Sequence, residues 1–239
     1  MRYLLAFWLL LIGFGCTKPA VEPILTGGPS TTPIPPAAGP AVEFLSLGDS
    51  YTIGEGVPAA DRWSVQLARM AQTQGLNLQT PDIIARTGWT TGELKAAIQA
   101  ANVQKIYGLV SLLIGVNNQY RGMPLTTYQT EFRELLQTAI RLAGGRPERV
   151  FVLSIPDWGA SPYARGRDQT KIASEIDQYN AVAKQESQQA GVAFVDITGF
   201  TRTASGDATQ FTMDGLHYSG PHMKLWAQAA LPVIQGLLK

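Results

Sequence analysis

The feature that most constrains the fold of this chain is the alternation of short apolar runs with longer segments of helical spacing. The apolar runs expected to form strands are 42–47, 77–86, 107–115, 150–155 and 192–197. The segments expected to form helices are 62–74, 91–101, 126–143, 168–190 and 220–238. Strands that alternate with helices join through right-handed crossovers into a parallel sheet covered on both faces. We therefore expect a three-layer α/β/α sandwich around a mostly parallel, five-stranded sheet.

The ends of these strands carry the polar and aromatic residues of interest. Ser50 lies in the word Gly-Asp-Ser that closes the first apolar run, and Asn117 and Trp158 follow the third and fourth runs. Ligands of parallel α/β sheets gather beyond the carboxyl ends of the strands. These three residues should therefore share one rim of the sheet. Pro81 interrupts the second run and leaves its pairing open.

A carboxylate and an imidazole stand three residues apart near the C-terminus, in Asp214-Gly-Leu-His217. A tight turn there would let Asp214 hold one ring nitrogen of His217 and leave the other nitrogen for a serine such as Ser50. The structural alternatives are a surface turn with a capping aspartate, and a serine that merely caps a helix. The other histidine, His222, follows a proline at the start of the last expected helix and is interpreted as structural. We expect Thr91 to be the N-cap of helix 91–101.

A serine that attacks a carbonyl group needs, besides a base, hydrogen-bond donors for the negative charge that develops on the carbonyl oxygen. Gly88 comes just before a helix, where an unpaired backbone N–H is natural. The side-chain amide of Asn117 could donate to the same oxygen. Alternatively, Asn117 and Asn118 form an ordinary turn pair.

Four blocks of the chain, from about Ala41 to Leu238, together resemble the SGNH, or GDSL, family of serine esterases and acylhydrolases. They are Gly-Asp-Ser at 48–50, the short block around Gly88, Gly-Val-Asn-Asn at 115–118 and Asp-Gly-Leu-His at 214–217. The third block departs from the family pattern, because Asn118 stands where an aspartate is usual. That change should alter the hydrogen bonds within the loop rather than the chemistry.

The resemblance implies an SGNH-hydrolase, flavodoxin-like fold and an esterase that cleaves lipid, short-chain or carbohydrate acyl esters without a cofactor. Its catalytic residues would be Ser50, Asp214 and His217. The oxyanion would be bound by the backbone N–H groups of Ser50 and Gly88 and by the Asn117 side chain. Trp89 and Trp158 lie in rim loops and are candidate substrate contacts, or packing residues at the sheet edge. The sequence does not predict the acyl chain length, the alcohol or the oligomeric state.

Two other functions stay open at this stage. The chain could be a non-catalytic lipoprotein that uses the same rim to bind a glycan or a small ligand, although an activated serine has no use in a pure binder. It could also be a metal-dependent hydrolase that uses Asp214, His217 and His222, although zinc favours a third strong ligand at a recognisable spacing. We expect no metal site.

The N-terminus has the pattern of an exported, anchored protein. Residues 1–15 combine Arg2 with an apolar run that is too short to span a membrane, as in a signal peptide. Cys16 follows a small residue, which resembles the bacterial lipoprotein processing site, with Gly13 in place of the usual leucine. Residues 16–40 are rich in Pro, Thr and Gly, with seven of the chain's 15 prolines, and should form an extended tether before the 41–239 domain. Ordinary secretion and an uncleaved anchor are the alternatives.

The composition excludes several classes of partner and crosslink. The formal net charge is +1 and charged residues make up 15% of the chain, so nothing indicates a nucleic-acid surface. A single cysteine permits no intramolecular disulfide. We expect a small ester as substrate and membrane contact through the lipid anchor, on the periplasmic or outer side of a bacterial membrane.

Overall fold

The computed structural model describes residues 39–239. The expected signal peptide, the expected lipidation site Cys16 and most of the expected tether lie outside these described residues. The 41–239 domain contains a five-stranded sheet with the order β2-β1-β3-β4-β5, in which every pairing is parallel. The strands are β1 (Phe44–Gly48), β2 (Asp82–Ala85), β3 (Leu109–Leu113), β4 (Val150–Leu153) and β5 (Ala193–Val195). The expected five-stranded parallel sheet is confirmed.

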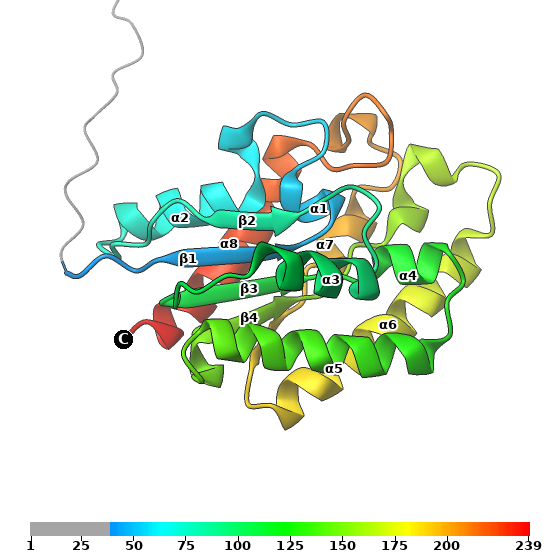
Figure 1. Cartoon of the computed structure of the whole chain (residues 1–239). Coiled ribbons are helices and arrows are strands. Elements are labelled where there is room, and N and C mark those ends of the chain that lie inside the picture. Colours follow the sequence, from blue (N-terminus) through cyan, green and yellow to red (C-terminus); the bar gives the residue numbers. More distant parts are fainter. Residues whose placement is uncertain (1–38) are drawn as a thin grey trace, which may run out of the picture. The chain divides into compact units, whose positions relative to one another are not determined.

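Helices cover both faces of this sheet (Figure 1). The longer helices are α2 (Trp63–Thr73), α3 (Thr91–Ala101), α5 (Leu125–Leu142), α6 (Gln169–Gln189) and α8 (Gly220–Leu237). The shorter ones are α1 (Ser50–Ile53), α4 (Val116–Tyr120) and α7 (Thr198–Thr203), with single 3₁₀ turns η1 (Ala59–Asp61), η2 (Pro147–Arg149), η3 (Trp158–Ala160), η4 (Pro162–Ala164) and η5 (Ala208–Gln210). Helix α2 packs against α8, while α5 packs against both α3 and α6. The three-layer α/β/α architecture is thus the one expected.

Two local features differ from the sequence-based expectations. Pro81 directly precedes β2 instead of interrupting it, and β2 is an edge strand paired with β1 alone. Thr90, not Thr91, is the N-cap of α3. Thr90 is the cap because it forms a capping box with Glu93. Its backbone N–H donates to Glu93 Oε2 at 2.8 Å, and its hydroxyl accepts from the Glu93 N–H.

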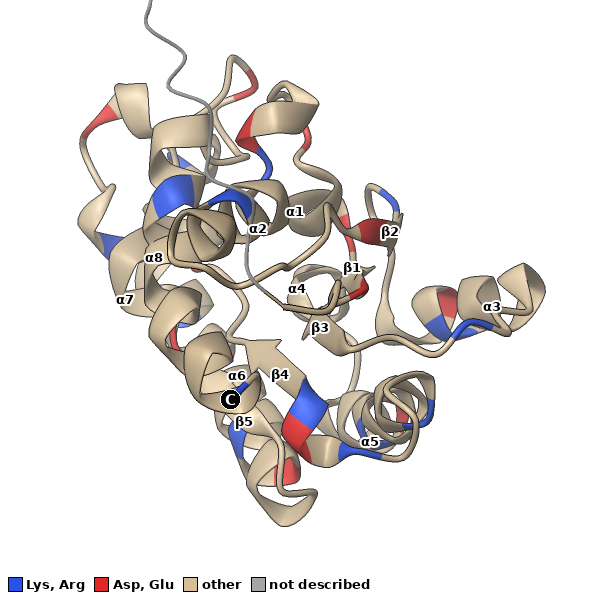
Figure 2. Ribbon diagram, turned by 90° about the vertical axis from the view of Figure 1, so that its left-hand side faces the viewer, with Lys and Arg blue, Asp and Glu red and all other residues tan. Residues whose placement is uncertain are grey.

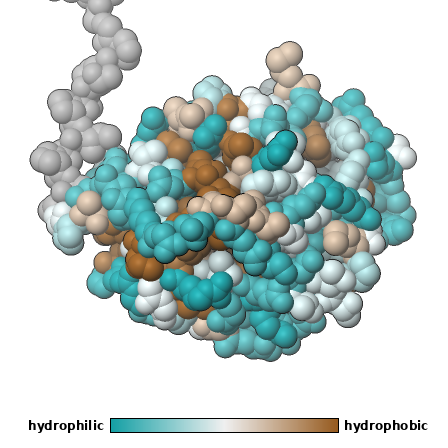
Figure 3. All heavy atoms as spheres, in the orientation of Figure 1, coloured by the Kyte–Doolittle hydropathy of each residue, from teal (hydrophilic) through white to brown (hydrophobic). Residues whose placement is uncertain are grey.

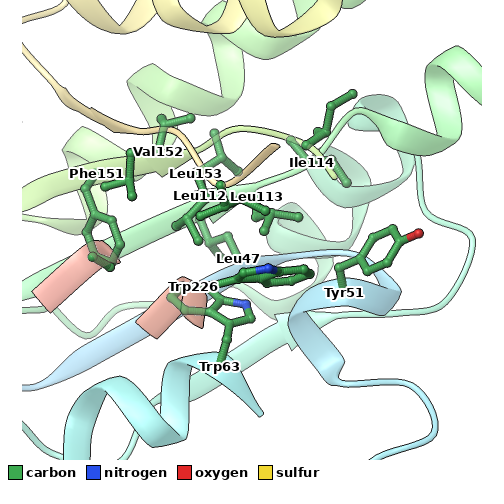
Figure 4. Packing of buried hydrophobic residues seen from close by; sticks show 14 of the residues in the cluster. Leu47, Tyr51, Trp63, Leu112, Leu113, Ile114, Phe151, Val152, Leu153 and Trp226 are labelled. Carbon is green, nitrogen blue, oxygen red and sulfur yellow. The ribbon is translucent and has the colours of Figure 1, made fainter. Parts of the chain in front are cut away.

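The core lies between the sheet and its two helical layers. Residues of β1, β3 and β4 are buried on both faces, as parallel strands in such a sandwich require. Figure 4 shows Trp63 of α2 and Trp226 of α8 beside Leu47, and both indole side chains are fully buried. Each buried side chain of this size contributes about 1.5–3 kcal/mol of transfer free energy. This packing fixes the strand ends, and with them the loops that form the site.

The surface of the described domain carries charges of both signs. Lys, Arg, Asp and Glu are scattered over the ribbon in Figure 2, and α3 carries both signs, whereas α2 and α8 carry only basic residues. The face in Figure 3 is mostly hydrophilic, with hydrophobic residues gathered in its central and left-hand parts. Among residues 39–239, none of the helices combines the length and the hydropathy needed to cross a bilayer.

Candidate active site

A pocket lies at the carboxyl edge of the sheet, where segments that follow different strands meet. Its volume is about 170 Å³. It is lined by Ser50, Tyr51, Thr87, Gly88, Val116, Asn117, Tyr120, Trp158, Tyr163, Leu216 and His217. Five of the eight residues singled out from the sequence therefore share one pocket: Ser50, Gly88, Asn117, Trp158 and His217. A larger surface groove between α3 and α5 is lined by neither histidine and by no serine.

Ser50 owes its position to a tight turn at the end of β1. A Cβ on Gly48 would collide with the Thr52 side chain and with the Leu113 carbonyl oxygen, so the close approach of α1 to β3 requires glycine. Asp49 is the N-cap of α1 and accepts a 3.0 Å hydrogen bond from the Tyr51 N–H. Capping is therefore the role of Asp49. Ser50 is left at the first helical position, where it lines the pocket.

The buried carboxyl of Asp49 is itself unusual. Its second oxygen, Oδ2, has no hydrogen-bond partner among the described residues, and the side chain is fully buried. Burial raises the pKa of Asp49 to about 7, against the lowering effect of the Tyr51 backbone N–H. The turn that presents Ser50 thus contains a carboxyl group that is protonated more readily than usual.

His217 is oriented by Asp214, as the three-residue spacing predicts. Nδ1 of His217 lies 2.6 Å from Asp214 Oδ2, and Asp214 Oδ1 accepts from the backbone N–H groups of Leu216 and His217 at 2.8 and 3.0 Å. The Thr212 hydroxyl donates to the same oxygen at 2.8 Å. Burial tends to raise the pKa of Asp214, but these hydrogen bonds, led by that from His217, lower it to about 2. Asp214 is therefore ionised at neutral pH.

An ionised carboxylate can only accept hydrogen bonds, so Nδ1 of His217 carries a hydrogen, and in the neutral imidazole the lone pair is then on Nε2. The imidazole is 6% exposed and packs on the ring of Tyr51, with ring centroids 5.3 Å apart. Ser50 and His217 line the same pocket, and no direct hydrogen bond joins them within residues 39–239. Catalytic hydrogen bonds are often long before the substrate binds.

Three N–H groups of the pocket lack a partner in the described part of the chain. The backbone N–H groups of Ser50 and Gly88 donate to no other residue. Gly88 has φ +83°, a conformation that favours glycine, and its carbonyl accepts from Arg121 Nη2 at 2.5 Å. Asn117 donates one amide hydrogen to the Trp89 carbonyl at 3.0 Å, which leaves its second amide hydrogen free.

Asn118, the departure from the family pattern, holds these two loops together. Its Oδ1 accepts from the Thr91 N–H at 3.0 Å, and its Nδ2 donates to Thr91 Oγ1 at 2.7 Å. The Thr91 hydroxyl then donates to the carboxylate of Glu131 on α5. An amide donates where an aspartate would accept, and Glu131 supplies the acceptor that the threonine hydroxyl needs. The hydrogen bonds thus run in one order, from the Asn118 amide to the Thr91 hydroxyl and from that hydroxyl to the Glu131 carboxylate.

Besides Asp214, which orients His217, two candidates lie outside the pocket lining. Trp89 packs partly against the core, and the site uses its carbonyl group rather than its ring. His222 is buried, with Nδ1 3.1 Å from Gln210 Oε1 and its ring stacked on Tyr218 at 4.5 Å. Across residues 39–239, no three His, Cys, Asp or Glu side chains are grouped so as to hold a metal ion.

Two aromatic residues that line the same pocket as Ser50 were not predicted from the sequence. Tyr120 and Tyr163 join Trp158 in lining the pocket, and Arg167 stands over all three rings at 5.1–5.7 Å from their centroids. These residues come from α4, from η3 and η4, and from the loop after η4. The only signal for them in the sequence is a concentration of aromatic residues in loops after β3 and β4.

The model of the "GDSL-like Lipase/Acylhydrolase family" matches residues 46–221 of the chain. A search of curated proteins gives no match. Solved structures with the same fold include TesA, with 19% identity and a TM-score of 0.64, where the alignment covers 82% of this chain and 99% of TesA.

Two further structures with this fold are those of esterases. The acetylxylan esterase Axe2 from Geobacillus stearothermophilus is 22% identical, with a TM-score of 0.64, over 83% of this chain and 96% of Axe2. The psychrotrophic esterase EstA from Pseudoalteromonas sp., inhibited by monoethylphosphonate, is 16% identical, with a TM-score of 0.60, over 82% of this chain and 98% of EstA. Identities this low establish the fold alone, whereas the family match spans most of the domain. The chain belongs to the GDSL-like lipase/acylhydrolase family and is a carboxylic ester hydrolase.

Proposed function

We propose that this protein hydrolyses esters through an acyl-enzyme formed on Ser50. The observation that carries the proposal is the shared pocket. It is lined by Ser50 and by a histidine that an ionised aspartate orients, and it has three N–H donors without a partner among residues 39–239. A serine hydroxyl becomes an effective nucleophile only when a base accepts its proton. His217 is the one base among the residues that line the pocket.

In the first step, His217 Nε2 accepts the Ser50 proton while Oγ bonds to the carbonyl carbon of the ester. Asp214 remains ionised and stabilises the imidazolium through Nδ1. The carbonyl oxygen becomes negatively charged in the tetrahedral intermediate. The N–H groups of Ser50, Gly88 and Asn117 would donate to that oxygen, and one such donor is worth about 10²–10³-fold in kcat.

In the second step, the C–O bond to the alcohol breaks and the leaving alkoxide takes the proton from His217 Nε2. The acyl group stays on Ser50. A water molecule then gives a proton to Nε2 and attacks the acyl carbonyl, and the same donors bind the second oxyanion. Collapse of that intermediate releases the carboxylic acid and returns the proton to Ser50 Oγ.

The acyl-enzyme can be trapped and located. We would mix the protein with 4-nitrophenyl acetate, quench within milliseconds, and identify the acetylated peptide by mass spectrometry. The expected result is one acetyl group per chain on Ser50, together with a burst of nitrophenolate. Ser50→Ala should lose both signals, and Ser205→Ala, which removes an exposed serine outside the pocket, should keep them. A full burst in Ser50→Ala contradicts the proposal.

We infer that the substrates of this protein are esters of small acyl groups. Lipid, short-chain and carbohydrate acyl esters all present the same carbonyl, and among the structures with this fold Axe2 is an acetylxylan esterase. Axe2 is thus named for the removal of acetyl groups from xylan. This comparison supports a small acyl ester as the substrate of the present protein.

We also propose that the protein is exported and anchored by a lipid on Cys16. The support is the order of a basic start, a short apolar run, a cysteine and a proline-rich segment in residues 1–40. The test is incorporation of labelled palmitate by bacterial cells that express the full chain. Label that disappears in Cys16→Ser supports the anchor, whereas label that persists, or secretion of the wild type without label, contradicts it.

A further inference from the structure

Three aromatic residues form a continuous wall on one side of the pocket. Tyr120 packs edge-on against Trp158 with ring centroids 5.2 Å apart, and Tyr163 packs against the same indole at 6.2 Å. The hydroxyl oxygens of Tyr120 and Tyr163 lie 2.9 Å apart and share a hydrogen bond. We call Tyr120, Trp158 and Tyr163 the aromatic wall.

A hydrogen bond to Gln119 and the guanidinium group of Arg167 hold the aromatic wall in place. The Trp158 indole is 4% exposed and donates from Nε1 to Gln119 Oε1 at 2.7 Å. The Arg167 guanidinium lies 5.4 Å from the Trp158 ring centroid and 5.1 Å from that of Tyr163, close enough for cation–π attraction to both. Hydrogen bonds and stacking therefore fix the positions of the three rings. The rings form one boundary of the pocket and limit its size on that side.

The remaining volume is small. The pocket holds about 170 Å³, whereas sites for drug-sized ligands span roughly 300–1,000 Å³. A protein cavity of about 150 Å³ accommodates one benzene molecule, with six carbon atoms. None of the residues that line the pocket is Lys, Arg, Asp or Glu. The space thus suits an uncharged group of about six carbons or fewer.

From these observations we propose that the enzyme is selective for esters of short, uncharged acyl groups and that the aromatic wall sets the upper limit of chain length. This inference depends on the acyl-enzyme mechanism proposed above. The acyl group must stay beside Ser50 while the alcohol leaves and water enters, so the acyl part is the one that the pocket has to enclose. The alcohol departs in the second step, so the pocket does not have to enclose it.

The test is a series of 4-nitrophenyl esters with one leaving group and increasing acyl length: acetate, butyrate, hexanoate, octanoate and laurate. We expect kcat/KM to fall at least about tenfold from butyrate to octanoate, because one methylene that does not fit a pocket already costs about tenfold or more. A wild-type enzyme that cleaves octanoate or laurate as well as butyrate overturns the inference.

Variants of the wall separate a geometric limit from an intrinsic preference. Tyr163→Ala should raise the octanoate-to-butyrate ratio of kcat/KM at least about tenfold, and Tyr120→Ala provides an independent opening of the same wall. Tyr163→Phe keeps the ring and removes only the hydroxyl bonded to Tyr120, so it should change the ratio much less than Tyr163→Ala. Phe200→Ala removes an exposed aromatic ring outside the pocket lining and should also retain that ratio. Thermal unfolding of each variant would establish that it is folded.

The outcomes distinguish the two proposals. Unchanged ratios in folded Tyr163→Ala and Tyr120→Ala overturn the role of the wall, while the acetylation of Ser50 by 4-nitrophenyl acetate can still be intact. A wild-type protein that hydrolyses no ester of the series and shows no acetylated Ser50 contradicts the proposed function, and the inference falls with it.

Discussion

The buried histidine His222 makes a prediction for stability whose size can be calculated from the structure. His222 is 1% exposed, and its Nδ1–H donates to Gln210 Oε1, while Nε2 has no partner in the described residues. Protonation would place a new N–H at Nε2 without an acceptor. Burial accordingly lowers the pKa of His222 from 6.5 to about 4.

The sign of the pH effect follows from linkage. Because the folded-state pKa is lower than the unfolded value, the unfolded chain binds more protons below pH 6.5, and the free energy of unfolding decreases as the pH falls from 6.5 toward 4. Each pH unit in that window is worth about 1.4 kcal/mol. Between pH 8 and pH 5 His222 therefore removes about 2 kcal/mol of stability.

The measurement is urea unfolding of wild type and His222→Phe at pH 8 and pH 5. Phenylalanine keeps the stacking on Tyr218 but cannot titrate, and its loss of the Gln210 hydrogen bond has the same effect at both pH values. We expect the change in unfolding free energy between the two pH values to differ by about 2 kcal/mol between the two proteins. Equal changes in both proteins would refute the assignment of His222 as a neutral, buried residue.

Three further predictions concern the residues around Ser50. Asn117→Ala removes an oxyanion donor and should lower kcat for 4-nitrophenyl acetate by about 10²–10³-fold with little change in KM; a change confined to KM contradicts the role. Asp214→Asn should lower kcat by about 10⁴-fold, because the amide can donate to Nδ1 and favour the wrong tautomer of the imidazole; circular dichroism should show an unchanged fold, and near-normal kcat would argue against Asp214. Asp49 has a pKa raised to about 7 by burial, so its stabilisation is full below its unfolded value of 3.8 and is lost as the pH rises through 7. Asp49→Asn should therefore lose less unfolding free energy than wild type between pH 5 and pH 8, and an equal loss in urea titrations would count against the buried, protonated carboxyl.

The sheet and its order of elements follow from local patterns that any reader of the sequence can use. The five apolar runs became strands because parallel strands buried on both faces need continuous hydrophobic residues. The helix starts were less well predicted, since Thr90 and Thr91 have equal capping chemistry. The choice between them depends on Glu93, which completes a capping box with Thr90 alone.

The residues of the candidate site also fall into two groups, those that the sequence predicts and those that it does not. Ser50 and the Asp214–His217 pair were predictable because each lies in a short sequence word whose backbone geometry is local. Tyr120 and Tyr163 were not, because their contact joins segments more than forty residues apart and depends on how α4 and η4 pack. The role of the Trp89 ring was predicted from its position in a rim loop, but loop position does not determine which way a side chain points.

The central claim is that Ser50 is the nucleophile activated by His217, and reaction with a fluorophosphonate tests it most directly. We would incubate wild type, Ser50→Ala, His217→Ala and Ser205→Ala with the probe and follow covalent labelling over time by intact-mass spectrometry. The account predicts one phosphonate per chain on Ser50 in wild type and Ser205→Ala, none in Ser50→Ala, and much slower labelling in His217→Ala. Stoichiometric labelling of Ser50→Ala, or wild-type rates in His217→Ala, would contradict it.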